Sequence, residues 1–158
     1  MNLHAGFHVF LHLRRRTGGP QWAFLSELVD RMDLVDIGAN LCHESFQHDM
    51  DAVLQRAAAQ GVNRLVVTGA SREGSEHALA LATTHPGRLY ATAGVHPHHA
   101  IDYDDATDAR RRELSHAPAV RAIGETGRDD FRKYAPRDVQ LRVFERQLQI
   151  AVDRGRPR

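Results

Sequence analysis

Apolar residues follow two alternating patterns from residue 33 onward. Short apolar runs, most of them leading into a glycine, are typical of buried parallel strands. Between these runs, apolar residues recur three and four positions apart, as on one face of an amphipathic helix. Capping residues precede the helical segments, and Gly or Pro follows them. The pattern predicts strands at 34–38, 64–69, 89–95 and 120–124, and helices at 49–60, 71–85, 104–114 and 136–155.

The predicted strands recur with a nearly constant period. Their centres, Ile37, Val66, Ala93 and Ile123, lie 29, 27 and 30 residues apart, which is the length of a βαβ unit. We therefore expect an α/β fold of parallel β/α units with the sheet covered on both faces. Right-handed crossovers leave two arrangements, an open doubly wound sheet or part of a closed barrel. In both, ligands bind at the carboxyl ends of the strands.

Length and composition exclude several classes of protein. The 158 residues, 42% apolar and 26% charged, suffice for one domain, whereas a complete (β/α)₈ barrel needs about 250. The 21 basic and 20 acidic residues nearly cancel, so no overall charge attracts an anionic partner. No apolar run approaches the ~20 residues of a membrane span, and no membrane partner is expected. The single cysteine, Cys42, excludes a disulfide framework and favours a cytoplasmic location.

The first 31 residues differ from the remainder. They hold four arginines and two carboxylates, and Arg14–Arg16 follows the apolar stretch, the reverse of the order in a signal peptide. His4, His8 and His12 are spaced as on one helix face, but no cysteine or carboxylate lies near them to complete a metal site. We expect residues 1–31 to be an N-terminal extension and residues 32–158 to form the domain.

Residues that bind metals or move protons follow the third and fourth predicted strands. Glu125 stands between two glycines after the fourth strand. A carboxylate there can bind a divalent cation and orient water, or it can cap a helix or pair with an arginine. His96 and His98 follow the third strand with Pro97 between them, either as a ligand pair or as a turn. Asp36, near the end of the first strand, is placed to orient a ligand through a hydrogen bond.

These strand ends resemble, in their order and spacing, the TatD family of metal-dependent deoxyribonucleases. The resemblance extends from Met32 to about Gly155. It implies a (β/α)₈ barrel in which histidines and carboxylates at strand ends hold divalent metals, which activate water to attack a phosphodiester. Several members of the family trim DNA from the 3′ end. The matching segments are Asp36–Leu41, Gly61–Val62, Thr68–Gly69, Ala93–His98 and Ala122–Gly127, followed by Phe131–Arg132, Gln140, Phe144, Gln147 and Leu148.

Residue by residue, the resemblance assigns Glu125 as a metal ligand and the catalytic carboxylate. It places His96, His98 and Asp129 at the substrate, beside the metal. Many members have a His-x-His metal pair on the first strand, where this chain has a glycine and Asn40. A subgroup shares that form, and Asn40 offers a carbonyl oxygen as a weaker ligand. The implied cofactor is Mg²⁺, Mn²⁺ or Zn²⁺, and the implied substrate is DNA, single-stranded or at a 3′ end.

The chain holds about four of the eight units of such a barrel. The family's further histidines after strands five and six, and its aspartate after strand eight, would lie beyond Arg158. A metal ion needs several ligands. We therefore expect the N-terminal half of a TIM-like (β/α)₈ barrel, truncated after four units, that binds metal poorly and has little or no nuclease activity alone.

Three interpretations compete. The first is a hydrolase of phosphodiesters, and the second keeps the barrel but acts on an amide or another ester. The third is a non-catalytic half-barrel, either a remnant or a protein that associates with itself through open sheet edges. Direct nucleic-acid binding by Arg110–Arg112 has little support, because four nearby aspartates balance its charge. That run is predicted to be a solvated helix face.

Overall fold

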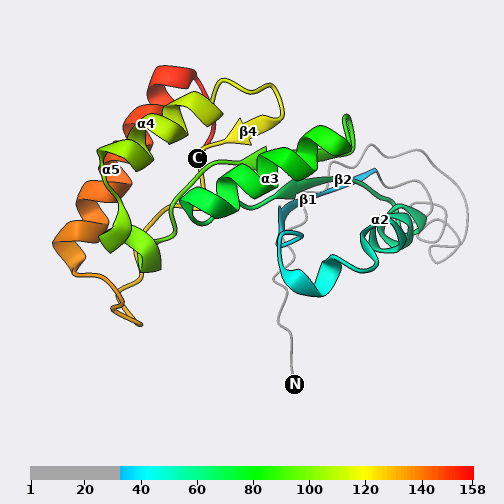
Figure 1. Ribbon diagram of the computed structural model, residues 1–158, viewed down its shortest axis with the longest axis horizontal. Helices are drawn as coiled ribbons and strands as arrows, with labels where there is room; N and C mark the ends of the chain where they lie inside the picture. The colour runs from blue at the N-terminus through cyan, green and yellow to red at the C-terminus, as the bar shows by residue number, and fades with distance from the viewer. Residues whose placement is uncertain (1–32) are drawn as a thin grey trace, which may run out of the picture.

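A computed structural model describes residues 33–158 as a four-stranded parallel sheet with helices packed on it (Figure 1). The extension predicted for residues 1–31 lies outside the described residues. Neighbouring strands in the sheet are also neighbours in sequence, and all pairs are parallel. A doubly wound sheet reverses its strand order at a switch point, and no reversal occurs among these strands, so the winding is that of a barrel. The strands are β1 (Leu34–Ala39), β2 (Val62–Val67), β3 (Leu89–Thr92) and β4 (Val120–Ala122).

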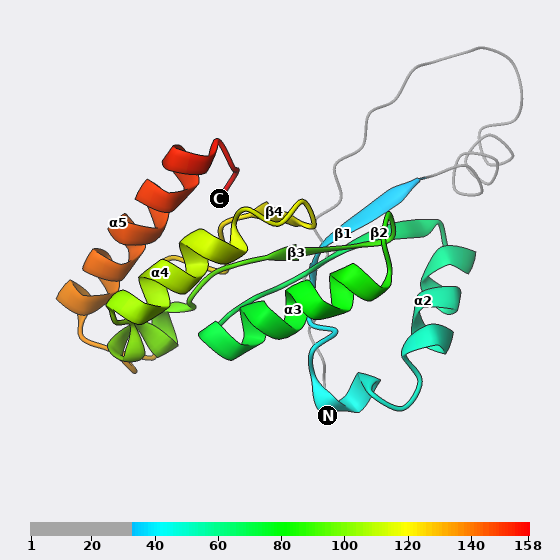
Figure 2. The same ribbon diagram turned by 45° about the horizontal axis from the view of Figure 1, so that its top comes forward.

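The helices connect successive strands, as the apolar periodicity predicts. Figure 2 shows α2 and α3 on one side of the sheet, and α5 packs against η2 and α4. Side-chain caps begin two of the helices: Ser71 accepts a hydrogen bond from Gly74 N–H, and Asp104 accepts one from Thr107 N–H. Gly155, with φ of 57°, ends α5 in the left-handed conformation. The α-helices are α2 (Met50–Ala59), α3 (Arg72–Thr84), α4 (Asp105–Leu114) and α5 (Arg137–Arg154), and the 3₁₀ helices are η1 (Glu44–Phe46) and η2 (Pro97–Asp102).

The two faces of the sheet have different surroundings. The helix side carries the main core, in which Leu65 of β2 is paired in register with Leu89 of β3, and both are buried. The opposite face carries Ile37, which is 61% exposed, and the neighbouring Val35 is also exposed. The described residues therefore cover one face of the sheet, and the expectation that helices cover both faces is not met. The open face corresponds to the inside of a barrel.

The backbone after α5 returns to the edge of the sheet. Ile123 N–H donates a hydrogen bond to the carbonyl oxygen of Pro157 over 2.9 Å. Figure 1 shows the C-terminal residues beside β4. The segment after α5 thus takes the place where the next parallel strand of a β/α repeat would lie. None of the helices between residues 33 and 158 combines the length and hydropathy of a membrane-crossing segment.

The prediction of a solvated face at Arg110–Arg112 is wrong for Arg111. Its side chain is only 1% exposed and lies between α4 and α3, where one terminal nitrogen donates to the hydroxyl of Ser75 over 2.8 Å. The Nε and the other terminal nitrogen have no hydrogen-bond partner among the described residues. Burial lowers the pKa of this guanidinium to about 10. Arg111 lies on the core side of α4. Of the three arginines in this run, only Arg110 and Arg112 therefore reach solvent.

We expect Arg111→Met to stabilise the fold. Replacing a poorly paired buried charge by an apolar side chain of similar volume is often neutral or stabilising, here by about 1–3 kcal/mol at pH 7. Arg111 is charged, and bears its desolvation cost, at every pH below about 10. Ser75 keeps its hydrogen bonds to Gly94 in the variant. The free energy of unfolding should be measured by urea denaturation.

The matched control is Arg110→Met, because Arg110 faces solvent and pairs with Glu76 and Glu113. Loss of these surface pairs should lower the free energy of unfolding by about 1 kcal/mol or less. If the free energy of unfolding of Arg111→Met is lower than that of the unsubstituted protein, the interpretation that Arg111 destabilises the fold is contradicted.

Candidate functional site

The carboxyl ends of three strands are tied together by backbone hydrogen bonds. Gly124 N–H donates to the carbonyl of Ala93 over 3.1 Å, and Glu125 N–H donates to the carbonyl of Gly69 over 2.8 Å. A Cβ atom at Gly94 would overlap the peptide that joins Gly124 to Glu125. The glycine at Gly94 therefore permits the close approach that brings the end of β4 against the end of β3.

His96 caps the start of η2 and His98 lies in its first turn, after the short segment that follows β3. Their rings meet edge to face with centroids 4.1 Å apart. The backbone N–H of His98 donates to Nδ1 of His96 over 3.1 Å, and His96 N–H donates to the carbonyl of Ala70. Of the two alternatives, a turn or a ligand pair, the structure shows the turn, which places both rings at the strand ends.

Glu125 faces His96 across the gap between β4 and β3. The Nε2 of His96 lies 3.6 Å from an oxygen of the Glu125 carboxylate, whose side chain is 49% exposed. Since Nδ1 of His96 accepts a hydrogen bond, neutral His96 carries its proton on Nε2, toward Glu125. Burial lowers the pKa of His96, against a smaller opposite effect of Glu125. His96 is therefore set as a neutral hydrogen-bond donor.

Asp129 holds the ring of His98. Its carboxylate lies 2.5 Å from Nε2 of His98, and the other oxygen accepts hydrogen bonds from the backbone N–H groups of Phe131 and Arg132, each over 2.9 Å. These bonds, that of His98 foremost, lower the pKa of Asp129 to about 2. Arg128, which sequence alone could not place, pairs with Asp130 and not with Asp129.

Two buried glutamines of α5 connect this region to the rest of the fold. Gln147 is fully buried and its amide pairs with both the N–H and the carbonyl of Val95, over 2.7 and 3.1 Å. Gln140 accepts from Asp129 N–H and donates to the carbonyl of Ala135, each over 2.8 Å. Sequence reasoning noted both glutamines only as matches to a family. Both glutamines occur at helical spacing among the apolar residues of α5, and this feature of the sequence could have indicated that they are buried.

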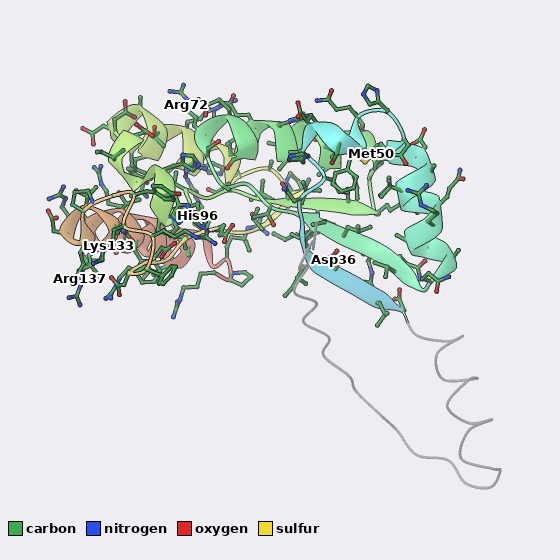
Figure 3. All side chains as sticks on the ribbon, turned by 90° about the horizontal axis from the view of Figure 1, so that it is seen from below. Asp36, Met50, Arg72, His96, Lys133 and Arg137 are labelled. Carbon is green, nitrogen blue, oxygen red and sulfur yellow. The ribbon has the colours of Figure 1, made fainter. Side chains whose placement is uncertain are left out.

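The residues expected near the first strand are not joined to this cluster. Asn40 is exposed, and its backbone carbonyl accepts a hydrogen bond from His43 N–H over 3.2 Å. Asp36 accepts from Gly38 N–H over 2.9 Å in a local turn. Figure 3 shows Asp36 on β1, well away from His96. The sequence placed these residues at the correct edge of the sheet without bringing them into contact with Glu125.

The donors present make an incomplete metal site. Within residues 33–158, no three His, Cys, Asp or Glu side chains gather closely enough to hold an ion. The carboxylate of Glu125 is half exposed, but His98 is engaged by Asp129, and His96 directs its N–H group toward Glu125 and so offers no lone pair to an ion there. Hard divalent cations take about six oxygen ligands, so Glu125 and Asn40 fit only part of the coordination that such an ion needs.

Comparison with known proteins identifies the protein family in which this arrangement of strand ends occurs. A family model described as "TatD related DNase" matches residues 35–158. The chain belongs to the TatD family. The TatD proteins of Musicola paradisiaca and Enterobacter lignolyticus, both named 3′-5′ ssDNA/RNA exonuclease, are each 44% identical over 124 residues, which is 78% of this chain and 47% of theirs. The chain spans about half the length of these relatives.

Solved structures of the TatD type share the fold. A TatD homologue from Escherichia coli superposes with a TM-score of 0.68 at 27% identity over 79% of this chain and 49% of that one. An uncharacterized amidohydrolase from Saccharomyces cerevisiae gives a TM-score of 0.65 at 28% identity over 76% and 44% of the two chains. These matches confirm the expected fold, the N-terminal half of a TIM-like barrel built from four β/α units.

We expect Asp129→Asn to destabilise the fold at neutral pH and to have less effect in acid. The pKa of Asp129 falls from 3.8 to about 2 on folding, so its ionised form stabilises the protein above pH 3.8, and this contribution is lost as the pH falls through about 2. The difference in thermal midpoint between the variant and the unsubstituted protein should therefore shrink between about pH 4 and 2.

Asp130→Asn is the matched control, because Asp130 pairs at the surface with Arg128. Its thermal midpoint should stay close to that of the unsubstituted protein throughout this range, as for most surface substitutions. A deficit of Asp129→Asn that is constant from pH 6 to 2 would show that the charge of Asp129 does not contribute to the stability of the loop.

Proposed function

We propose that this chain carries half of a TatD-type hydrolytic site and acts on the phosphodiester bonds of single-stranded DNA or RNA. The observation that carries the proposal is the meeting of Glu125, His96, His98 and Asp129 at the carboxyl ends of β3 and β4. Relatives of this family are named as exonucleases on single-stranded DNA and RNA. Active sites of β/α barrels lie at this end of the strands.

Each residue of the cluster has a distinct role in the proposal. Glu125 is the catalytic carboxylate and a ligand of a divalent cation, with Asn40 as a second oxygen ligand. A bound Mg²⁺, Mn²⁺ or Zn²⁺ would supply Lewis acidity and lower the pKa of water. The Nε2–H group of neutral His96 donates a hydrogen bond to an oxygen of the phosphate, and Asp129 fixes His98 so that its ring borders the bound substrate. With two protein ligands for the cation, turnover is expected to be slow.

We expect slow, metal-dependent cleavage that requires Glu125. The full chain is mixed in excess with a 5′-labelled single-stranded oligonucleotide and Mn²⁺ or Mg²⁺, and the products are resolved by length. Glu125→Gln removes the charged metal ligand and should lower the cleavage rate at least 100-fold, about the loss of 3 kcal/mol of transition-state stabilisation. Products shortened from the 3′ end would match the family.

Glu145→Gln is the matched control, because Glu145 is an exposed carboxylate on the outer part of α5. The Glu145→Gln variant should cleave the oligonucleotide at the same rate as the unsubstituted protein. Equal cleavage by Glu125→Gln would point to a contaminating nuclease and contradict the proposal, as would the absence of cleavage when the chain exceeds the oligonucleotide. EDTA should abolish the reaction in every sample.

We also propose the boundary and location that the sequence favours. The family match begins at residue 35, which supports an extension of residues 1–31 followed by a domain of residues 32–158. The cytoplasmic proposal rests on the single cysteine. Cys42 is half-buried, and burial raises the pKa of its thiol, which opposes a role as a thiolate nucleophile.

A second candidate function is association of two copies through the sheet. The open face of β1 exposes Ile37 and Val35 on a strand that pairs only with β2 among the described residues. Exposed apolar edge strands pair readily with other chains. This interpretation requires no catalysis, and it is compatible with a chain that binds nucleic acid.

If this face mediates association, we expect a monodisperse dimer at micromolar concentration, measured by size exclusion with light scattering. Ile37→Lys places a charge on the open face and should shift the protein to a monomer. A monomer before substitution would contradict the dimer interpretation. Soluble aggregate of broad mass would instead indicate a half-barrel remnant without a defined partner.

A further inference from the structure

The loop that joins β4 to α5 displays two aromatic side chains to solvent. Phe131 is 91% exposed and Tyr134 is 66% exposed. Burying an aromatic side chain removes a large apolar area from water and stabilises the fold. The two rings on this short loop contribute little of that stabilisation because they remain exposed. Exposed apolar groups gathered in this way mark binding surfaces.

Cationic residues alternate with these aromatics along the loop. Arg132, Lys133 and Arg137 form no ion pair with any carboxylate among residues 33–158, whereas most other arginines of the sheet's helical layer are paired. Lys133 has a φ of 54°, a conformation uncommon for residues other than glycine. The loop and the first residue of α5 thus present three positive charges without an ion pair in the described residues, beside two rings.

The loop is in direct contact with the proposed catalytic cluster. The ring of Tyr134 meets the ring of His98 edge to face, with centroids 4.6 Å apart. A hollow of about 640 Å³ continues outward from Asp129, between Lys133 and Arg137 at the start of α5. Figure 3 shows His96, Lys133 and Arg137 toward the same end of the molecule. The hollow therefore links Asp129 of the cluster to two of the cationic side chains, beside Asp130, whose carboxylate is paired with Arg128.

We propose, on the basis of the proposed function, that residues 128–137 form the platform that holds the unpaired nucleotides next to the cleaved bond. The bases stack on Phe131 and Tyr134, and the phosphates contact Arg132, Lys133 and Arg137. Aromatic rings that stack any base, combined with cations that follow the backbone, are the means by which proteins bind single strands without regard to sequence. A duplex keeps its bases stacked inside and cannot use the two rings.

The test measures binding separately from hydrolysis. Fluorescence anisotropy of a labelled dT15 oligonucleotide is recorded with the full chain in EDTA. Phe131→Leu and Tyr134→Leu keep apolar side chains but lose the rings, and each should weaken dT15 binding about fivefold or more, the lower end of stacking losses per base. An abasic oligonucleotide of the same length should bind the unsubstituted chain and Phe131→Leu equally, because it offers no base to stack.

The charges are tested by salt dependence. Lys133→Gln should reduce the slope of log affinity against log salt concentration by about 0.7, the value for one phosphate contact on a single strand. Val152→Ala and Arg56→Gln are controls, since Val152 is exposed on the far part of α5 and Arg56 lies on α2. Both should bind dT15 within twofold of the unsubstituted chain. Thermal midpoints show whether each variant is folded.

Unchanged dT15 binding by both folded ring variants would overturn the platform, as would tighter binding to duplex DNA than to dT15. The ring of Tyr134 contacts His98, whereas Phe131 is bonded to Asp129 only through its backbone N–H and its side chain is exposed, so Phe131 is the decisive position. Ring-dependent binding without any Glu125-dependent cleavage would contradict the proposed function while leaving the platform intact. Glu125-dependent cleavage, together with dT15 binding that neither ring substitution changes, would contradict the platform and support the proposed function.

Discussion

The structure depends on how the backbone at the end of β3 is paired where it leaves the sheet. Buried N–H and carbonyl groups must keep hydrogen-bond partners, and after Ala93, which still pairs with Ala122 and Gly124, side chains supply them. The hydroxyl of Ser75 pairs with both polar groups of Gly94, each over 3.2 Å, and the amide of Gln147 does the same for Val95. Both side chains are fully buried. Helices α3 and α5 are thereby fixed to two adjacent residues, Gly94 and Val95 respectively, directly before His96.

This pairing explains why the proposed site and the fold share helix α5. Gln140 and Gln147 lie seven residues apart, two helical turns, so they face the same side of α5. Gln147 holds the backbone of Val95, which directly precedes His96. Gln140 holds the backbone of Asp129, whose side chain fixes His98. The two halves of the histidine–carboxylate pair are thus positioned from a single rigid element, whereas the rings of Phe131 and Tyr134, between Asp129 and α5, remain exposed.

The regular elements could be predicted from sequence because they rest on local patterns. The helix predicted at 104–114 is found at Asp105–Leu114, with the cap at Asp104 that its sequence favours. The strand predicted at 89–95 ends early, at Thr92, because buried side chains distant in sequence take over its hydrogen bonds. The meeting of His98 with Asp129 and the burial of Arg111 likewise depend on contacts across 31 and 36 residues, and no local pattern contains that information.

The buried polar groups differ in what they contribute. The amide of Gln147 has partners at both ends, and the backbone groups it meets would be unpaired without it, so an apolar replacement would cost about 1–3 kcal/mol for each group left unpaired. Within residues 33–158, the guanidinium of Arg111 has one partner, and two of its nitrogens have none. The hydrophobic pattern alone would accept Leu at either position. A chain with Leu at Arg111 would keep this site, but a chain with Leu at Gln147 would retain the helices and lose the geometry that carries His96. Polar residues on the buried stripe of α5, and not its apolar residues alone, therefore position the proposed site within this fold.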